Sequence, residues 1–253
     1  MRRYALLCLV PLFALAQGFP WELSPRLPVQ APLVFVGAGF HGAYTPSLAA
    51  LQAIEGEWSC ATYRRGTGHG IGAGVQLEWW YAPKSALRAL VAVENARARF
   101  AAPAEPLPLA DGRMLQTEYR LIYGFWLLRA EALWKQRLGR WLWIGAGLWA
   151  ALQWRSDEEQ SEVVLSPEDY FFRTLPPARQ RQLTHARSIA LRPYGFGVRL
   201  RLGYDLMLSR WYPLYTAPAL LVGTSLTSLG TAATWSRWEL GFEIPLLLGL
   251  PRH

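Results

Sequence analysis

The stretch from Tyr194 to Leu208 constrains the fold more than any other part of this chain. All its even-numbered positions are apolar or aromatic, whereas its odd-numbered positions are mostly glycine or charged, among them Arg199, Arg201 and Asp205. This two-residue period predicts a β-strand with one apolar and one polar face. The stretch has fifteen residues, and strands of globular proteins usually have about five or six. A long strand of this kind is typical of a membrane-spanning β-barrel.

Seven further stretches alternate in the same manner. They cover residues 33–45, 70–82, 87–100, 114–135, 140–154, 212–225 and 234–248. The connections between the stretches alternate between long and short, which is the rhythm of an up-and-down barrel with both chain ends on one side. The sequence therefore predicts an all-β fold, an eight-stranded antiparallel up-and-down transmembrane β-barrel. Two alternatives stay open: a helix over 121–138, and extra strands within the long connections 46–69 and 155–188.

Composition agrees with strands that cross a membrane. The chain is 52% hydrophobic and 17% charged, whereas soluble domains carry about a quarter of charged residues. After the N-terminus there is no uncharged apolar run of about 18 residues, which a membrane-spanning helix requires. The net charge of +8 comes from arginines scattered along the chain. A nucleic-acid-binding surface needs a clustered basic patch, so we expect no nucleic-acid partner.

The N-terminus predicts export. Residues 1–16 resemble a signal peptide, with Arg2 and Arg3, an apolar segment and an Ala-Leu-Ala cleavage site at 14–16. Residues 17–32 form a proline-rich lead-in, and 33–253 form the barrel. Only Cys60 remains as a cysteine of the mature chain, which excludes an internal disulfide. An exported barrel of this type is expected in the outer membrane.

The polar face of the strands predicts the barrel interior. An eight-stranded barrel is just wide enough for side chains to fill it, and buried charges must be paired. We therefore expect a structural network of ion pairs in the lumen. Its predicted members are Glu78, Glu118, Arg120, Arg199, Arg201, Asp205, Arg237, Glu239 and Glu243.

Aromatic residues gather next to the short connections. In membrane barrels such residues form a girdle at the lipid–water interface. The predicted interfacial aromatics are Trp79, Trp80, Tyr81, Trp141, Trp143, Trp211 and Tyr212.

Two possible chemical sites are weak. Residues 37–42 match the G-x-G-x-x-G pattern of dinucleotide-binding proteins, but strands follow them where a helix is required. The glycines are better interpreted as small residues facing a crowded lumen. His41, His69 and His185 have no adjacent nucleophile or orienting acid in the sequence. We therefore predict that the protein is not an enzyme and holds neither a cofactor nor a metal ion.

The glycine-rich strands carry a family resemblance. The segments 68–78 (GHGIGAGVQLE), 143–148 (WIGAGL) and 195–204 (GFGVRLRLGY) resemble the outer-membrane β-barrel domain proteins of the Bacteroidetes and Chlorobi, which include OmpA-type and PorT-like barrels. The resemblance covers about 33–249. It implies a barrel, and because the chain ends at His253 we expect no C-terminal peptidoglycan-binding domain.

The segment 239–246 resembles the signal read by the barrel-assembly machinery, which the resemblance implies as a partner. The chain departs from that signal at Pro245 and by ending on Pro251-Arg-His253.

Together these features predict a monomeric outer-membrane barrel with a filled lumen, a structural or surface-interaction role and an unidentified extracellular partner. Its surroundings would be outer-membrane lipid. The alternatives are a small transporter or channel, which needs a wider barrel, and a soluble periplasmic barrel that binds an apolar ligand, which needs charge outside and apolar residues inside.

Overall fold

The computed structural model describes residues 34–55, 58–139, 141–186, 192–209, 212–230 and 234–250. The predicted signal peptide, the lead-in and Trp211 lie outside these ranges, so they remain predictions.

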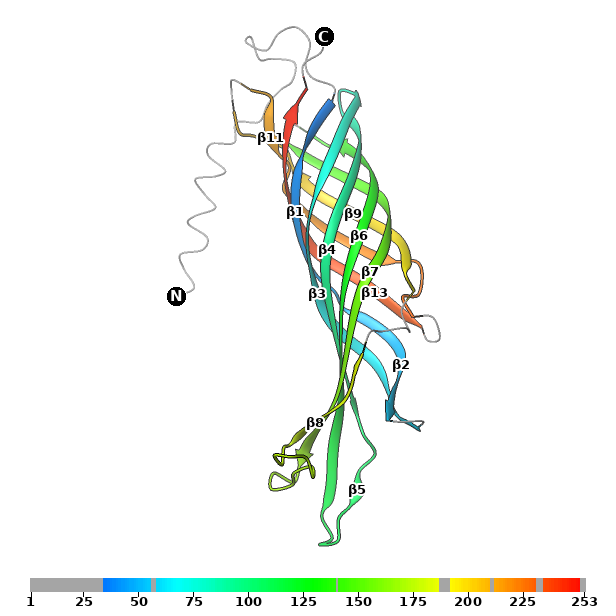
Figure 1. Cartoon of the computed structure of the whole chain (residues 1–253). Helices are drawn as coiled ribbons and strands as arrows, with labels where there is room; N and C mark the ends of the chain where they lie inside the picture. Colours follow the sequence, from blue (N-terminus) through cyan, green and yellow to red (C-terminus); the bar gives the residue numbers. More distant parts are fainter. Residues whose placement is uncertain are drawn as a thin grey trace.

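Eight antiparallel strands close into a barrel (Figure 1). They are, in barrel order, β1 (Val34–Tyr44), β3 (Trp58–Ala82), β4 (Ser85–Pro103), β6 (Met114–Arg137), β7 (Leu142–Ser166), β9 (Tyr194–Tyr204), β12 (Ala219–Ser225) and β13 (Trp235–Gly249). The last strand pairs back onto the first from Phe35–Gly249 to Tyr44–Leu240. The predicted fold class is confirmed. The helix alternative for 121–138 is wrong, because β6 runs through almost all of it as one strand.

Five shorter strands complete the sheet. They are β2 (Ser47–Glu55), β5 (Leu107–Pro108), β8 (Gln180–Ala186), β10 (Leu206–Met207) and β11 (Leu214–Thr216). The stretch 194–208, predicted as one strand, contains the ring strand β9, which ends at Tyr204, and the two-residue strand β10. Among the described residues, no helix is long and apolar enough to cross a bilayer.

Much of the two longest predicted connections is strand. β3 begins at Trp58, β7 continues to Ser166, and β2 and β8 pair with them outside the ring. Figure 1 shows these segments continuing past the barrel, where the hairpin of β2 and β3 separates from β5, β6 and β8. We call this part of the chain the extension; it comprises residues 47–55, 58–68, 97–103, 107–125 and 155–186. Of these residues, 97–100 and 114–124 were predicted as strand, whereas 46–69 and 155–188 were predicted as connections in which extra strands stayed open. Strands outside a membrane need no apolar outer face, so the signal of the ring strands is absent there.

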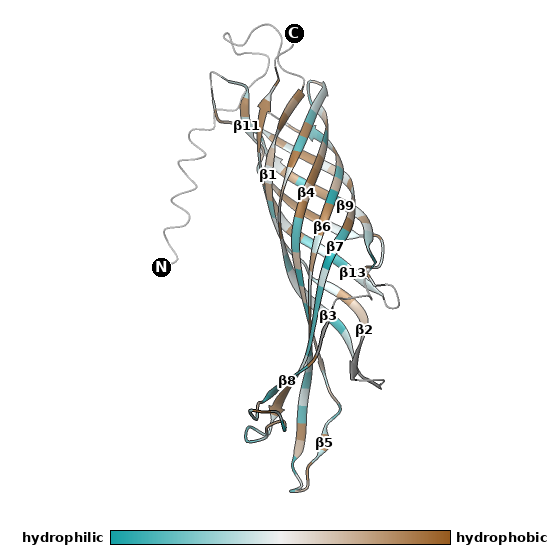
Figure 2. Cartoon of the chain, in the orientation of Figure 1, coloured by the Kyte–Doolittle hydropathy of each residue, from teal (hydrophilic) through white to brown (hydrophobic). Residues whose placement is uncertain are grey.

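Exposed apolar side chains are present on all eight ring strands, and Figure 2 shows hydrophobic residues along the strands of the barrel. The exposed side chains are Phe40, Ile71, Val75, Leu77, Leu87, Val91, Val93, Leu128, Ile144, Leu148, Leu200, Leu202, Leu220, Val222, Leu240, Phe242, Ile244 and Leu246. A closed barrel with an apolar belt outside and charge inside is suited to a lipid bilayer. This polarity contradicts the soluble periplasmic barrel.

In the extension the inward side chains are apolar, whereas in the barrel they are charged. On β6 the inward positions Tyr119, Leu121 and Phe125 belong to an apolar cluster around the fully buried Trp235. Further along the same face of β6 the inward residues are Arg129 and Glu131. The alternation continues unbroken along the whole strand. Only the residue types change, where the strand leaves the bilayer.

Candidate functional site

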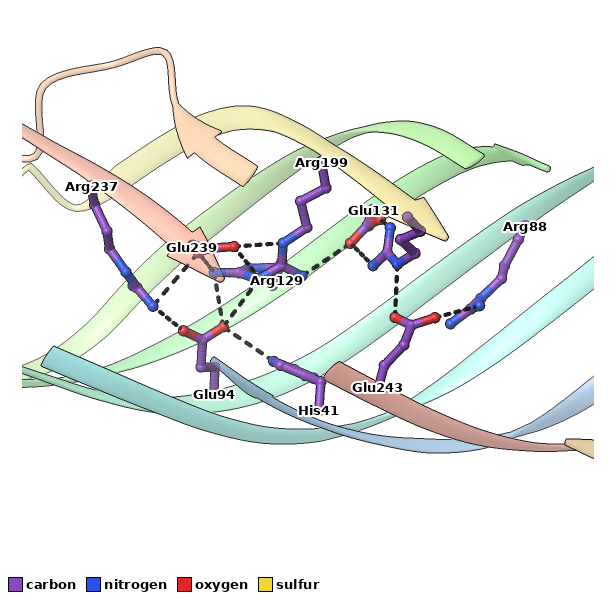
Figure 3. A network of polar contacts seen from close by, with 10 residues as sticks. His41, Arg88, Glu94, Arg129, Glu131, Arg199, Arg237, Glu239 and Glu243 are labelled. Carbon is purple, nitrogen blue, oxygen red and sulfur yellow. Dashed lines mark hydrogen bonds and ion pairs between the residues drawn. The ribbon is translucent and has the colours of Figure 1, made fainter. Parts of the chain in front are cut away.

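The lumen holds a continuous network of buried charges (Figure 3). Its central acid is Glu94 of β4, which is 1% exposed. One carboxylate oxygen accepts a hydrogen bond from Arg237 Nη2 at 2.6 Å, and the other lies 2.8 Å from Arg129 Nη2 and 3.3 Å from His41 Nε2. Four strands that are distant in sequence therefore meet at one carboxylate.

The network continues from Glu94 towards the short-turn end of the barrel. Glu239 accepts hydrogen bonds from Arg129 Nη2 at 3.0 Å and from Arg199 Nε at 2.6 Å. Arg199 and Arg201 both donate to Glu131, Arg199 at 3.2 Å. These bonds join β6, β9 and β13 across the lumen.

A last acid completes this part of the network. Glu243 accepts a hydrogen bond from Arg201 Nε at 2.8 Å and forms an ion pair with Arg88 Nη1 at 2.7 Å. The chain of ion pairs thus crosses the barrel from Arg237 to Arg88.

A second cluster surrounds Lys135, which has no exposed surface. Its ammonium donates to Asp205 at 2.6 Å and to both oxygens of Glu78 at 3.3 Å. The same ammonium lies 4.8 Å from the ring centre of Trp143 and 5.1 Å from that of Trp80. Cation–π attraction of this kind strengthens when the cation is desolvated, so the aromatic rings help to hold a buried charge.

The buried charges nearly balance. In the described part of the barrel the bases are Arg88, Arg129, Lys135, Arg137, Arg199, Arg201 and Arg237, and the acids are Glu78, Glu94, Glu131, Asp205, Glu239 and Glu243. Each of these groups lies within ion-pair distance of an opposite charge. Buried ions cost several kcal/mol each when unpaired, so the pairing is what makes a polar lumen compatible with a stable barrel.

The structure places seven of the nine predicted lumen residues in the lumen. These are Glu78, Arg199, Arg201, Asp205, Arg237, Glu239 and Glu243. Glu118 and Arg120 are elsewhere: they pair with each other at 2.8 Å on the outer face of the extension. The prediction was wrong for these two because it took the apolar residues of 115–125 for a lipid-facing surface, whereas they form the core of the extension.

Half of the network was not predicted, and for its four members on β6 the reason is the same. The predicted lumen set did not include His41, Arg88, Glu94, Arg129, Glu131, Lys135 and Arg137. One signal was present: Arg129, Glu131 and Lys135 share the parity of Tyr119 and therefore its face of the strand. If that face had pointed to lipid, three charges would have been in the bilayer.

The predicted interfacial aromatics divide into two groups. Trp79, Tyr81, Trp141 and Tyr212 are exposed, and Trp134 Nε1 donates to the Tyr81 hydroxyl at 3.0 Å. Trp80 and Trp143 point inward and are 5% and 0% exposed. They alternate with outward residues, so adjacent aromatics cannot all face lipid.

A second aromatic girdle lies at the base of the extension. Its residues were not among the predicted interfacial aromatics. Its exposed members are Tyr44, Trp126, Trp154, Tyr194, Phe196 and Trp238. Trp126 and Trp154 stack, with ring centres 6.4 Å apart. On β6, Trp126 and Trp134 of the two girdles are eight residues apart, or about 26 Å along the strand. Strands of membrane barrels are tilted by about 35–45°, so the two girdles are about 20 Å apart across the membrane, close to the roughly 25 Å apolar band.

The glycine motif at 37–42 lies within β1. This strand pairs with β13 on one side and with β3 on the other. A Cβ atom at Gly37 would be 1.8 Å from the carbonyl oxygen of Leu246, so the close approach of the strands requires glycine there. A phosphate-binding loop needs free backbone N–H groups before a helix, and this segment has neither. Within the described residues no group of three or more potential ligands could hold a metal ion.

The extension has its own stabilising contacts near its end. Leu115, Val164 and Phe172 form a separate buried cluster. Arg113 donates from Nε to Asp111 at 2.7 Å and from Nη1 to Asp169 at 2.8 Å, which joins two segments of the extension. Hydrogen bonds from the Arg113 backbone and guanidinium lower the pKa of Asp111. The extension is therefore a folded sheet.

Comparison with known proteins gives structural similarity only. No family model and no curated protein matches the chain. Among solved structures, it is similar to Neisserial surface protein A (10% identity, 85% of this chain and 97% of that chain, TM-score 0.36). It is also similar to OprG from Pseudomonas aeruginosa (12% identity, 85% of this chain and 96% of that chain, TM-score 0.31). A third similar structure is the outer membrane protease OmpT from Escherichia coli (8% identity, 90% of this chain and 100% of that chain, TM-score 0.30). The assignment of the barrel fold depends on the strand pairing described above.

The surface chemistry identifies the environment of the barrel. A closed ring of strands, an apolar belt on every strand and aromatic girdles at both edges are the features of an outer-membrane β-barrel. The chain is therefore an outer-membrane β-barrel protein.

Proposed function

We propose that this protein is a non-conducting outer-membrane barrel that presents the extension outside the cell as a binding platform. The observation that carries the proposal is the lumen, where charges from opposite walls meet at 2.5–3.3 Å and fill the cross-section. A water-filled path would require these ion pairs to be separated. The finer assignment to the OmpA-type and PorT-like barrels, a monomeric state and delivery by the barrel-assembly machinery are part of the same proposal.

The shape of the extension supports an interaction role. In outer-membrane barrels the long loops face outward and the short turns face the periplasm, which supports an extension outside the cell. Several apolar side chains are exposed on it or on its connections, including Leu107, Leu165, Phe171 and the fully exposed Leu175. A folded sheet that exposes apolar residues loses little conformational entropy when a partner binds.

Planar-bilayer recording tests the sealed lumen. We expect the purified full-length protein to give no stable conductance, because the ion-pair network occupies the path. A porin inserted into the same bilayer is the positive control. A steady open pore would overturn the proposal and favour the transporter or channel alternative.

Cysteine labelling of intact cells tests the orientation. In a Cys60→Ser background, we expect Leu175→Cys on the extension to react with a membrane-impermeant maleimide. Lys84→Cys, in a turn at the opposite end, is the matched control and should react only after lysis. Labelling of Lys84→Cys but not Leu175→Cys on intact cells would reverse the orientation.

A further inference from the structure

Four arginines form a cluster on the outer face of the extension, close to the barrel. They are Arg65 on β3, Arg97 and Arg99 on β4, and Arg120 on β6. All four are exposed. None belongs to the ion-pair network of the lumen, so the fold does not need them there. We call this set the arginine cluster.

Strand register brings the cluster together. Arg99 lies opposite Thr67 on β3 and opposite Ile122 on β6. Arg65 and Arg120 each lie two residues before those partners in the sequence, which makes them diagonal neighbours of Arg99 at about 7–8 Å. Arg65, Arg99 and Arg120 line one open groove on this face. Three guanidinium groups from three strands can therefore reach a single ligand.

The positive charge of the cluster is largely uncompensated. Glu118 pairs with Arg120 at 2.8 Å. Arg65, Arg97 and Arg99 have no ion-pair partner among the residues that the structure describes. Two further outward acids lie on β7: Glu159 opposite Ile122, and Asp157, which is 3.6 Å from Arg155.

The height of the cluster relative to the bilayer is the second observation. Asn95 of β4 lies opposite Trp126 of the aromatic girdle at the base of the extension. Arg97 and Arg99 follow two and four residues beyond Asn95, or about 7 and 13 Å along the strand. This is the layer next to the aromatic belt, where lipid head groups lie.

We propose that the arginine cluster binds the phosphate groups of a lipid of the outer leaflet. Arginine matches phosphate with bidentate hydrogen bonds, and basic side chains beside a membrane surface attract anionic head groups. The apolar outer face of β3 and β4 directly below, including Ile71, Val91 and Val93, is in position to contact the acyl chains of the same lipid. The proposal rests on the orientation proposed above, with the extension outside.

Refolding into defined vesicles tests the proposal. The full chain is refolded into phosphatidylcholine vesicles with or without 10 mol% (about one lipid in ten) diphosphoryl lipid A, and the urea midpoint is followed by tryptophan fluorescence. Ligands that bind the native state raise its stability by mass action. We expect lipid A to raise the midpoint of the wild type, and Arg97→Gln/Arg99→Gln to lose at least half of that rise.

Matched controls make the result specific. Arg64→Gln/Arg173→Gln removes the same charge from exposed positions outside the cluster and should keep the full rise. Dephosphorylated lipid A, or inorganic phosphate with neutral vesicles, should give no rise. Three results would each overturn the proposal. The first is an equal rise of the midpoint in both double variants. The others are a rise with dephosphorylated lipid A, or with inorganic phosphate, that equals the rise with diphosphoryl lipid A. The assay does not depend on orientation in the cell, so its failure is distinct from a failure of the cysteine labelling.

Discussion

Replacing Glu94 with alanine is expected to lower the free energy of unfolding by about 3–5 kcal/mol, the usual cost of removing one partner from a buried ion pair. The variant leaves Arg237 and Arg129 buried without the carboxylate that lies 2.6 and 2.8 Å from them. Arg129 keeps Glu239 at 3.0 Å, whereas Arg237 retains only the same acid at 3.6 Å. Urea titration of the refolded barrel, followed by tryptophan fluorescence, measures the effect.

Glu118→Ala is the matched control for this prediction. It removes the same side chain from an ion pair whose arginine, Arg120, is 48% exposed, and exposed pairs contribute about 0–1 kcal/mol. A similar small loss in both variants would show that water enters the lumen and screens the network. That result would also weaken the proposal of a sealed barrel.

Replacing Val91 with arginine is expected to cost about 2–4 kcal/mol, the range for a cation on the lipid-facing side of a membrane barrel near the bilayer midplane. Val91 is 47% exposed on the outer face of β4. It lies between the two aromatic girdles, opposite Val75 of β3 and Ala130 of β6. In vesicles its exposed surface contacts lipid, so the added charge loses its hydration.

Leu165→Arg provides the comparison. Leu165 is 46% exposed, but it is on the extension, where water replaces lipid. Surface substitutions of this kind usually change stability by less than about 0.5 kcal/mol. If Val91→Arg cost as little as Leu165→Arg, the outer surface of the barrel would face water and the membrane assignment would be wrong.

Alternation alone was sufficient to predict the eight ring strands. Residues 195–205 show why: small, charged and apolar positions follow a strict two-residue period that admits no other regular structure. Alternation was not sufficient to say which face points inward. On β6 the inward face carries Tyr119 in the extension and Arg129 in the membrane. The residues of this face therefore change from apolar to charged, while the two-residue period stays the same.

The partners of the buried charges were also beyond the sequence. Glu94 and Arg237 are 143 positions apart, and only closure of the ring brings β4 and β13 to opposite sides of one narrow lumen. The arginine cluster depends on register in the same way, since a shift of one residue would turn Arg99 to the other face.

The sequence by itself determined a chain of alternating strands, because a two-residue period is a local property of the backbone. The tertiary structure decided how far those strands continue, which face each side chain occupies and which charges meet. These outcomes depend on where the bilayer ends along each strand and on the register of strands distant in sequence. Neither quantity is encoded within any single strand.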